Sequence, residues 1–224
     1  MIPMYPMFVD LAETPVLVVG GGTVAARKAR ALVRCGAVVT VVALDACEEI
    51  RAMADSSMLN LQVREFRVED LDGKRLAIAA TNSDGVNEAV AQRCRSLGVW
   101  LNAVDDPARC DFHAPSVIER GAVQVAVSTS GTAPALGRKL KEEIGSMLEP
   151  SLGAYAELVS EARRRIREGL FDRSSEERAC AMEAVLATDA RQRFASGDAE
   201  GARRVIMDLL ELMPSDGRDD DARS

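Results

Sequence analysis

Short apolar runs alternate with amphipathic stretches along the first half of the chain. The run Pro15–Gly20 is continuously apolar and closes on glycines, which is typical of a strand buried in a parallel sheet. Apolar residues then recur at helical spacing over Thr23–Cys35, and Gly36 stands where a helix stop is expected. Strands that alternate with helices predict an α/β fold with a doubly wound parallel sheet. The remaining predicted strands are Ala37–Ala43, Leu59–Phe66, Arg75–Thr81 and Val99–Val104, with a helix over Asp84–Leu97.

The pattern changes after Pro115. A β-branched run over Ala122–Ser128 predicts one more strand, and a helix is expected over residues 133–148, before the helix breaker Pro150. From Ser151 onward the spacing of apolar residues predicts helices alone. The clearest are a stripe over Leu152–Val159 and the stretches Glu176–Leu186 and Glu200–Leu212.

Composition and charge narrow the class of protein. The 224 residues are 47% hydrophobic and 28% charged, which excludes a disordered or collagen-like chain. The net charge of −7 argues against general binding of nucleic acid or of an anionic membrane, because the long-range field repels polyanions. Residues 214–224 are polar and are expected to form a disordered tail.

The start of the chain and its cysteines indicate a cytoplasmic protein. No basic run precedes a long apolar segment, and the apolar stretches are far shorter than the roughly 20 residues that cross a bilayer. The five cysteines share no C-x-x-C spacing, which favours reduced thiols. With a single histidine beside them, they predict no metal site.

The first strand leads into a glycine loop. Gly20-Gly21-Gly22-Thr23-Val24-Ala25 fits the pattern G-x-G-x-x-G/A between a strand and a helix, which predicts a Rossmann-like dinucleotide site. Gly20 permits the tight turn, Gly22 lets the backbone approach a pyrophosphate, and Ala25 allows close packing of helix on strand. The backbone N–H groups at the helix start then bind anionic oxygen. The alternative is a glycine-rich turn that serves packing alone.

An acidic residue at the end of the second strand usually binds the ribose hydroxyls of the cofactor. Asp45 follows that strand, slightly late, and no basic residue is expected where the 2′-phosphate of NADP would lie. The sequence therefore favours NAD over NADP.

Polar residues follow the fourth and fifth predicted strands. Thr81 and Asn82 end one, and Asn102 and Asp105 end the next, so all four are expected on the same edge as the glycine loop. Thr81 and Asn82 are candidates to contact the cofactor, and Asn102 is a candidate to contact the substrate. Crowding by the acidic residues 106 and 111 would raise the pKa of Asp105 and make it a better base. The alternative is an aspartate that only caps a turn.

A second anion-binding loop is predicted at Ser128-Thr129-Ser130-Gly131-Thr132, just before a helix N-terminus with Pro134 in its first turn. The alternative is simple N-capping by serine or threonine, and both interpretations can hold together.

Six short stretches follow one another in the order of a known family. They are Phe8–Leu11, Val18–Lys28, Ala79–Asn82 with Asn87, Asn102–Asp105, Asp111–Pro115 and Val125–Pro134. Over about residues 5–148 the chain resembles the N-terminal module of siroheme synthase, the precorrin-2 dehydrogenases that often double as sirohydrochlorin ferrochelatases.

This resemblance implies a homodimer built from a NAD-binding Rossmann domain (1–113), a dimerisation segment (114–149) and a helical domain (150–213). It implies NAD-dependent oxidation of precorrin-2 to sirohydrochlorin, with insertion of Fe²⁺ as a second activity. The essential aspartate of the family corresponds to Asp105, and the serine phosphorylated in some members corresponds to Ser128 or its neighbour. The methyltransferase domain of full-length siroheme synthases is not expected within 224 residues. Candidates to contact the substrate carboxylates are Arg27, Lys28, Arg109, Arg120, Arg138, Lys139 and Lys141.

Two other functions stay open on the residues alone. One is a NAD-dependent dehydrogenase of another small substrate, which predicts a Lys, His or Tyr proton donor. The other is a non-enzymatic NAD-sensing module, which explains the glycine loop but neither the Asn102–Asp105 nor the Ser128–Pro134 stretch. His113 is expected to be packed or hydrogen-bonded rather than to bind a metal.

Overall fold

A computed structural model of the chain describes residues 4–169 and 174–212, so the tail predicted at 214–224 lies outside the described residues. The chain forms two compact units. Of the described residues, the first unit holds those up to Ala114 together with Ser128–Ala133, and the second holds Pro115–Val127 and those from Pro134 onward.

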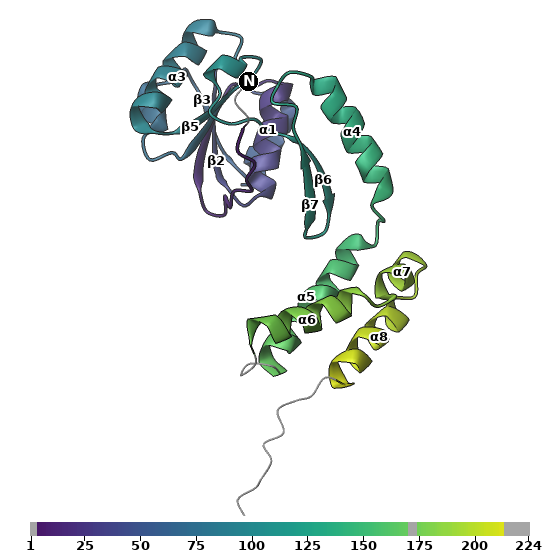
Figure 1. Ribbon diagram of the computed structural model, residues 1–224. Coiled ribbons are helices and arrows are strands. Elements are labelled where there is room, and N and C mark those ends of the chain that lie inside the picture. Colours follow the sequence, from purple (N-terminus) through teal and green to yellow (C-terminus); the bar gives the residue numbers. More distant parts are fainter. Residues whose placement is uncertain (1–3, 170–173, 213–224) are drawn as a thin grey trace, which may run out of the picture. The chain divides into compact units, whose positions relative to one another are not determined.

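A five-stranded parallel sheet forms the centre of the first unit (Figure 1). Its order is β3-β2-β1-β4-β5, so the chain adds strands first on one side of β1 and then on the other. Val18 of β1 lies between Val41 of β2 and Ile78 of β4. The predicted doubly wound α/β fold is confirmed. The strands are β1 (Pro15–Val19), β2 (Val38–Ala43), β3 (Asn60–Val63), β4 (Leu76–Ala79) and β5 (Trp100–Ala103).

Helices cover both faces of this sheet (Figure 1). On one face α1 (Thr23–Arg34) and α2 (Glu48–Asp55) pack on alternate β1 residues. On the other face α3 (Asp84–Leu97) and the short 3-10 helix η1 (Val68–Leu71) pack on the remaining β1 residues, Leu17 and Val19. The buried residues of α1 are alanines, which bring its axis close to the sheet.

The second unit begins with a hairpin that the sequence pattern only half predicted. Strand β7 (Val123–Val127) was expected, but it pairs antiparallel with β6 (Ser116–Arg120), which was missed. Gly121 has a φ of +59° in the turn, a conformation that glycine adopts readily. A short stretch with β-branched residues before a glycine is typical of a hairpin, and this pattern could have predicted β6.

Helices make up the rest of the second unit. The helix α4 (Pro134–Met147) packs on the hairpin. Tyr155 and Leu158, from the predicted stripe, are buried in the helical core with Ile206. In the described ranges no helix is both long and apolar enough to cross a membrane. The other helices are α5 (Leu152–Gly169), α6 (Ser175–Leu186), α7 (Ala190–Ala195, not predicted) and α8 (Ala199–Leu212).

Candidate functional site

The sheet order places the candidate site at the carboxyl ends of β1, β4 and β5. The order of strands reverses between β1 and β4, and ligands of open α/β sheets bind in the crevice beyond such a switch point. The loop Gly20–Gly22 follows β1, and the loop Ala80–Asn82 follows β4. The two loops therefore lie side by side at one edge of the sheet.

The three glycines of the first loop have different structural roles. Gly20 has a φ of +124°, and a methyl group on it would lie 2.2 Å from the carbonyl oxygen of Ala80. A methyl group on Gly21 would lie 1.7 Å from the carbonyl oxygen of Asp45. By contrast, a methyl group on Gly22 would meet no heavy atom within 4 Å. Packing thus requires Gly20 and Gly21, while the space in front of Gly22 is open.

The start of α1 fits an anionic group. Gly22 is its N-cap and supplies no side-chain acceptor, and the first turn carries no acidic residue. The first helical hydrogen bond runs from Ala26 N–H to Gly22 C=O (2.9 Å), so the N–H groups of residues 23–25 have no partner in the helical ladder. These donors and the positive end of the helix dipole suit a pyrophosphate.

Asp45 lies beside a cation that the sequence analysis overlooked. Its Oδ1 accepts hydrogen bonds from Ala46 N–H (2.8 Å) and from Arg51 Nη2 (2.6 Å). The expectation that no basic residue stands near this position is therefore wrong. The helix α2, which carries Arg51, was not predicted. For this reason the contact between Arg51, in its first turns, and Asp45 could not be foreseen.

Thr81 and Asn82 differ in their contacts. The hydroxyl of Thr81 donates to Asn87 Oδ1 (2.9 Å), and Asn87 Nδ2 donates to the Thr81 carbonyl (3.0 Å). This pair fixes the loop after β4 on the first turns of α3. Asn82 is exposed at the same edge.

Asp105 occupies a sharp turn after β5. Its φ of +60° is in the left-handed region, which aspartate tolerates better than most residues, and its side chain is exposed. The neighbouring acidic groups are already engaged: Asp106 pairs with Arg109 (2.9 Å), and Asp111 accepts from Leu101 N–H (2.9 Å). The charge of Arg109 therefore offsets part of the negative charge beside Asp105. In the described parts of the chain, the Asp105 carboxylate itself has no ion pair or hydrogen bond.

Two of the arginines considered for substrate carboxylates have partners of their own. Arg109 pairs with Asp84 (3.2 Å) and Glu88 (3.0 Å) as well as with Asp106, which raises its pKa. Arg120 donates to the carbonyl of Gly145 (3.0 Å) and so ties β6 to α4. Both guanidinium groups are therefore already engaged in contacts within their own units.

Lys28 is the better-placed cation. It is half-buried on α1, and burial together with the nearby charge of Arg27 lowers its pKa. No carboxylate lies within ion-pair distance of it among residues 4–169 and 174–212. An ammonium group that is partly desolvated and lacks a counter-ion favours an anionic ligand.

Asn102 and the nearby thiols support the turn around Asp105. Asn102 is buried, and its Nδ2 donates to the carbonyl of Phe112 (3.0 Å). The Cys110 thiol donates to the Ala103 carbonyl (3.2 Å), and burial raises its pKa. Burial raises the pKa of Cys94 to about 12. Neither thiol is a nucleophile at neutral pH, because thiol reactivity follows the thiolate.

The loop Ser128–Thr132 shows capping hydrogen bonds. Ser128 Oγ accepts from Ser130 N–H (3.1 Å), and Thr129 Oγ1 accepts from Ala133 N–H (3.3 Å). Gly131 faces His113, because a methyl group on Gly131 would lie 3.4 Å from His113 Cε1. The capping interpretation thus has direct contacts, and binding of an anion by this loop stays a prediction.

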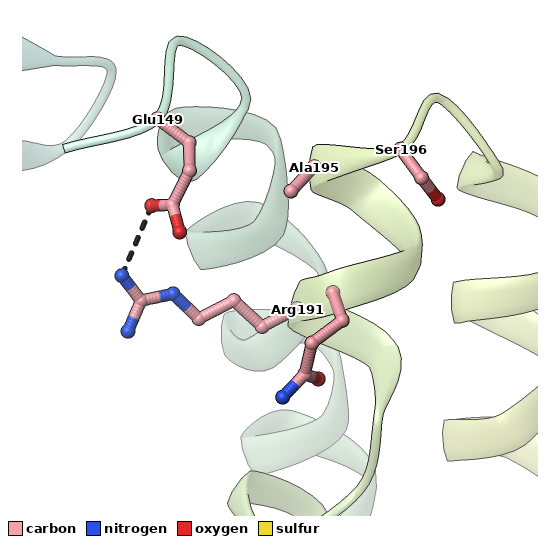
Figure 2. Close-up of a pocket in the computed structure, with 5 residues that line it drawn as sticks. Glu149, Arg191, Ala195 and Ser196 are labelled. Atoms are coloured by element: carbon pink, nitrogen blue, oxygen red, sulfur yellow. Dashed lines mark hydrogen bonds and ion pairs between the residues drawn. The ribbon is translucent and has the colours of Figure 1, made fainter. Parts of the chain in front are cut away.

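A hollow of about 620 Å³ in the second unit contains none of these residues. Figure 2 shows Glu149, in the turn before α5, pointing toward Arg191 of α7. The Arg191 Nη2 and Glu149 Oε2 atoms of this ion pair are 3.0 Å apart. The hydrogen bond from Arg191 lowers the pKa of Glu149, and the ion pair joins the two segments. Within the described residues, no three His, Cys, Asp or Glu side chains are grouped as metal ligands would be.

Comparison with known families and structures gives consistent matches. Residues 7–116 match a family described as NAD(P)-binding, and residues 120–147 match the family "Sirohaem biosynthesis protein central". The solved structure "SirC, precorrin-2 dehydrogenase" superposes with a TM-score of 0.76 at 25% identity, covering 93% of this chain and 99% of that one.

Two curated relatives are named siroheme synthases. Siroheme synthase of Methylococcus capsulatus is 39% identical over 206 residues, which are 92% of this chain and 43% of that protein. Siroheme synthase 2 of Cronobacter sakazakii is 37% identical over 205 residues, which are 92% of this chain and 45% of that protein. The chain thus spans less than half the length of these two relatives.

Proposed function

The chain belongs to the family of the siroheme synthase N-terminal module, and from this premise we propose that it oxidises precorrin-2 to sirohydrochlorin with NAD. The observation that carries the proposal is the unpartnered Asp105 carboxylate at the end of β5, on the same sheet edge as the open glycine loop. A NAD sensor would need this aspartate only for its turn, at a φ of +60°.

Some residues at this edge of the sheet bind the cofactor, and others bind the substrate or accept its proton. Gly22 and the N–H groups of residues 23–25 bind the pyrophosphate, and Asp45 accepts from the ribose hydroxyls. When bound, NAD supplies the hydride acceptor. Asp105 takes the proton that leaves the macrocycle as the hydride departs. Lys28 and the loop Ser128–Thr132 contact the substrate carboxylates.

Insertion of the metal also requires a group that accepts protons from the macrocycle. Pyrrole N–H protons must leave as Fe²⁺, a substrate of this reaction, enters the macrocycle. We propose that Asp105 accepts these protons too, so that one carboxylate serves both steps. A homodimer formed through residues 114–149 and a cytoplasmic location remain part of the proposal.

A two-stage assay tests this function. Purified protein with NAD and precorrin-2 is expected to produce NADH and the absorption spectrum of sirohydrochlorin, and Co²⁺ or Fe²⁺ added afterwards should give the metallated spectrum faster than without protein. No NADH production would overturn the dehydrogenase and leave the NAD sensor. Oxidation without accelerated metallation would restrict the protein to the first step.

The contact between Asp45 and Arg51 makes a prediction about cofactor choice. Asp45→Ala removes the acceptor for ribose hydroxyls and releases Arg51 to meet a 2′-phosphate. Since a charged hydrogen bond contributes about 1.5–3 kcal/mol, the NAD/NADP ratio of kcat/KM should fall about tenfold or more. Steady-state kinetics with both cofactors measures this. The double variant Asp45→Ala/Arg51→Ala should lose the gain in NADP use, and an equal loss with both cofactors would contradict the assignment.

A further inference from the structure

A second, larger hollow lies along α5 and α6, which pack side by side in the helical unit (Figure 1). Its volume is about 1010 Å³, at the upper limit of the range of sites that hold organic ligands. Its lining is rich in arginine and holds a single acidic residue. We call it the arginine groove, lined by Ser160, Arg163, Arg164, Ile166, Arg167, Glu168, Ser175, Arg178, Ala179 and Met182.

Three arginines of the groove are uncommitted. Arg163, Arg164 and Arg167 of α5 have no hydrogen bond or ion pair with any described residue. Other arginines of the same unit are paired: Arg165 and Arg203 both contact Glu161, at 3.0 and 2.7 Å. The arrangement therefore separates arginines that stabilise the helical unit from arginines that face the groove.

The grouping of these arginines lowers the stability of α5 when no anion is bound. Arg163 and Arg167 are four residues apart, a spacing at which like charges destabilise a helix, and Arg164 stands between them. Only Glu168 opposes them in the lining. Positive charge collected in a hollow raises the local concentration of anions.

The lining also holds apolar residues. Ile166 is buried and Met182 is half-buried, and the polar residues Ser160 and Ser175 complete the lining beside the charged ones. A ligand that fits such a surface is large, with apolar faces and several carboxylates at its edge, because guanidinium groups bind carboxylates in bidentate geometry.

We propose that the arginine groove binds the carboxylates of a polycarboxylated tetrapyrrole, in addition to the site at the sheet edge. The identity of the ligand rests on the proposed function, whereas the class of ligand rests on the groove. A bound macrocycle lies over Ile166 and Met182, with its carboxylates on Arg163, Arg164 and Arg167.

Binding of uroporphyrin, a stable octacarboxylate, to the full chain tests this proposal. Hydrogen exchange should show protection of α5 and α6 on binding. The variant Arg163→Gln/Arg164→Gln/Arg167→Gln should lose that protection and bind about tenfold or more weakly. The matched control Arg165→Gln/Arg193→Gln/Arg203→Gln removes the same charge from paired arginines and should retain the protection. Circular dichroism establishes that both variants are folded.

The outcomes separate this proposal from the proposed function. Equal weakening in both variants would show a nonspecific charge effect and overturn the groove, as would unprotected α5 and α6 in a chain that oxidises precorrin-2. Protection of α5 and α6 in a chain that does not oxidise precorrin-2 would support the groove and leave the dehydrogenase refuted.

Discussion

Asp105→Asn is expected to slow oxidation of precorrin-2 by about 10²–10⁴-fold, the usual contribution of a general base. Asparagine keeps the size of the side chain and also tolerates the left-handed φ of +60°, so the change removes the base without straining the turn. Affinity for NAD should stay the same, because the cofactor contacts that we propose lie on the loops after β1, β2 and β4. Single-turnover NADH production, with NAD binding measured separately, checks both statements.

The neighbouring carboxylate supplies the control for Asp105. Asp106→Asn alters charge one residue away but breaks the pair with Arg109, so it should cost stability more than rate. If Asp105→Asn turns over like the wild-type protein with NAD bound, Asp105 has no role in proton transfer and the proposed mechanism fails. A loss of metallation in the same variant would extend its role to the second step.

Substitutions in the glycine loop should separate folding from cofactor binding. Gly20→Ala places a methyl group against the Ala80 carbonyl at a φ of +124°, so the free energy of unfolding should fall by about 3 kcal/mol or more. Gly22→Ala meets no protein atom and its φ of −81° suits alanine, so the fold should persist. Its methyl group would keep the pyrophosphate from the helix N–H groups and weaken NAD binding about tenfold or more.

Denaturant unfolding and titration with NAD measure the two glycine effects independently. Fluorescence-monitored unfolding of both variants gives stability, and quenching of the protein by NAD gives affinity. If Gly22→Ala binds NAD as tightly as the wild-type protein does, the loop serves packing alone, which is the alternative that the sequence left open. A stable Gly20→Ala variant would contradict the close approach of the β1 and β4 loops.

Some features could not be predicted because their signals are short. The helix α2 spans only Glu48–Asp55, and β6 spans only Ser116–Arg120, so neither provides many turns or alternations. The missed α2 had a direct consequence for the site. Without it, the pairing of Arg51 with Asp45 could not be foreseen, and neither could the prediction about cofactor choice that rests on this pairing.

The sequence alone determined the α/β class, the order of the five strands together with α1 and α3 in the first unit, and the residues at the carboxyl ends of the strands. These follow from local periodicity and from glycines whose positions only a tight turn explains. The partner of each charged group was decided by the tertiary structure. Folding pairs Arg109 with Asp84 (3.2 Å) and Arg203 with Glu161 (2.7 Å), residues that are far apart in the sequence. It leaves Asp105 unpartnered among the described residues and places Arg163, Arg164 and Arg167 at a hollow. Ion pairs form between groups brought together in space, and spacing along the chain does not encode that proximity.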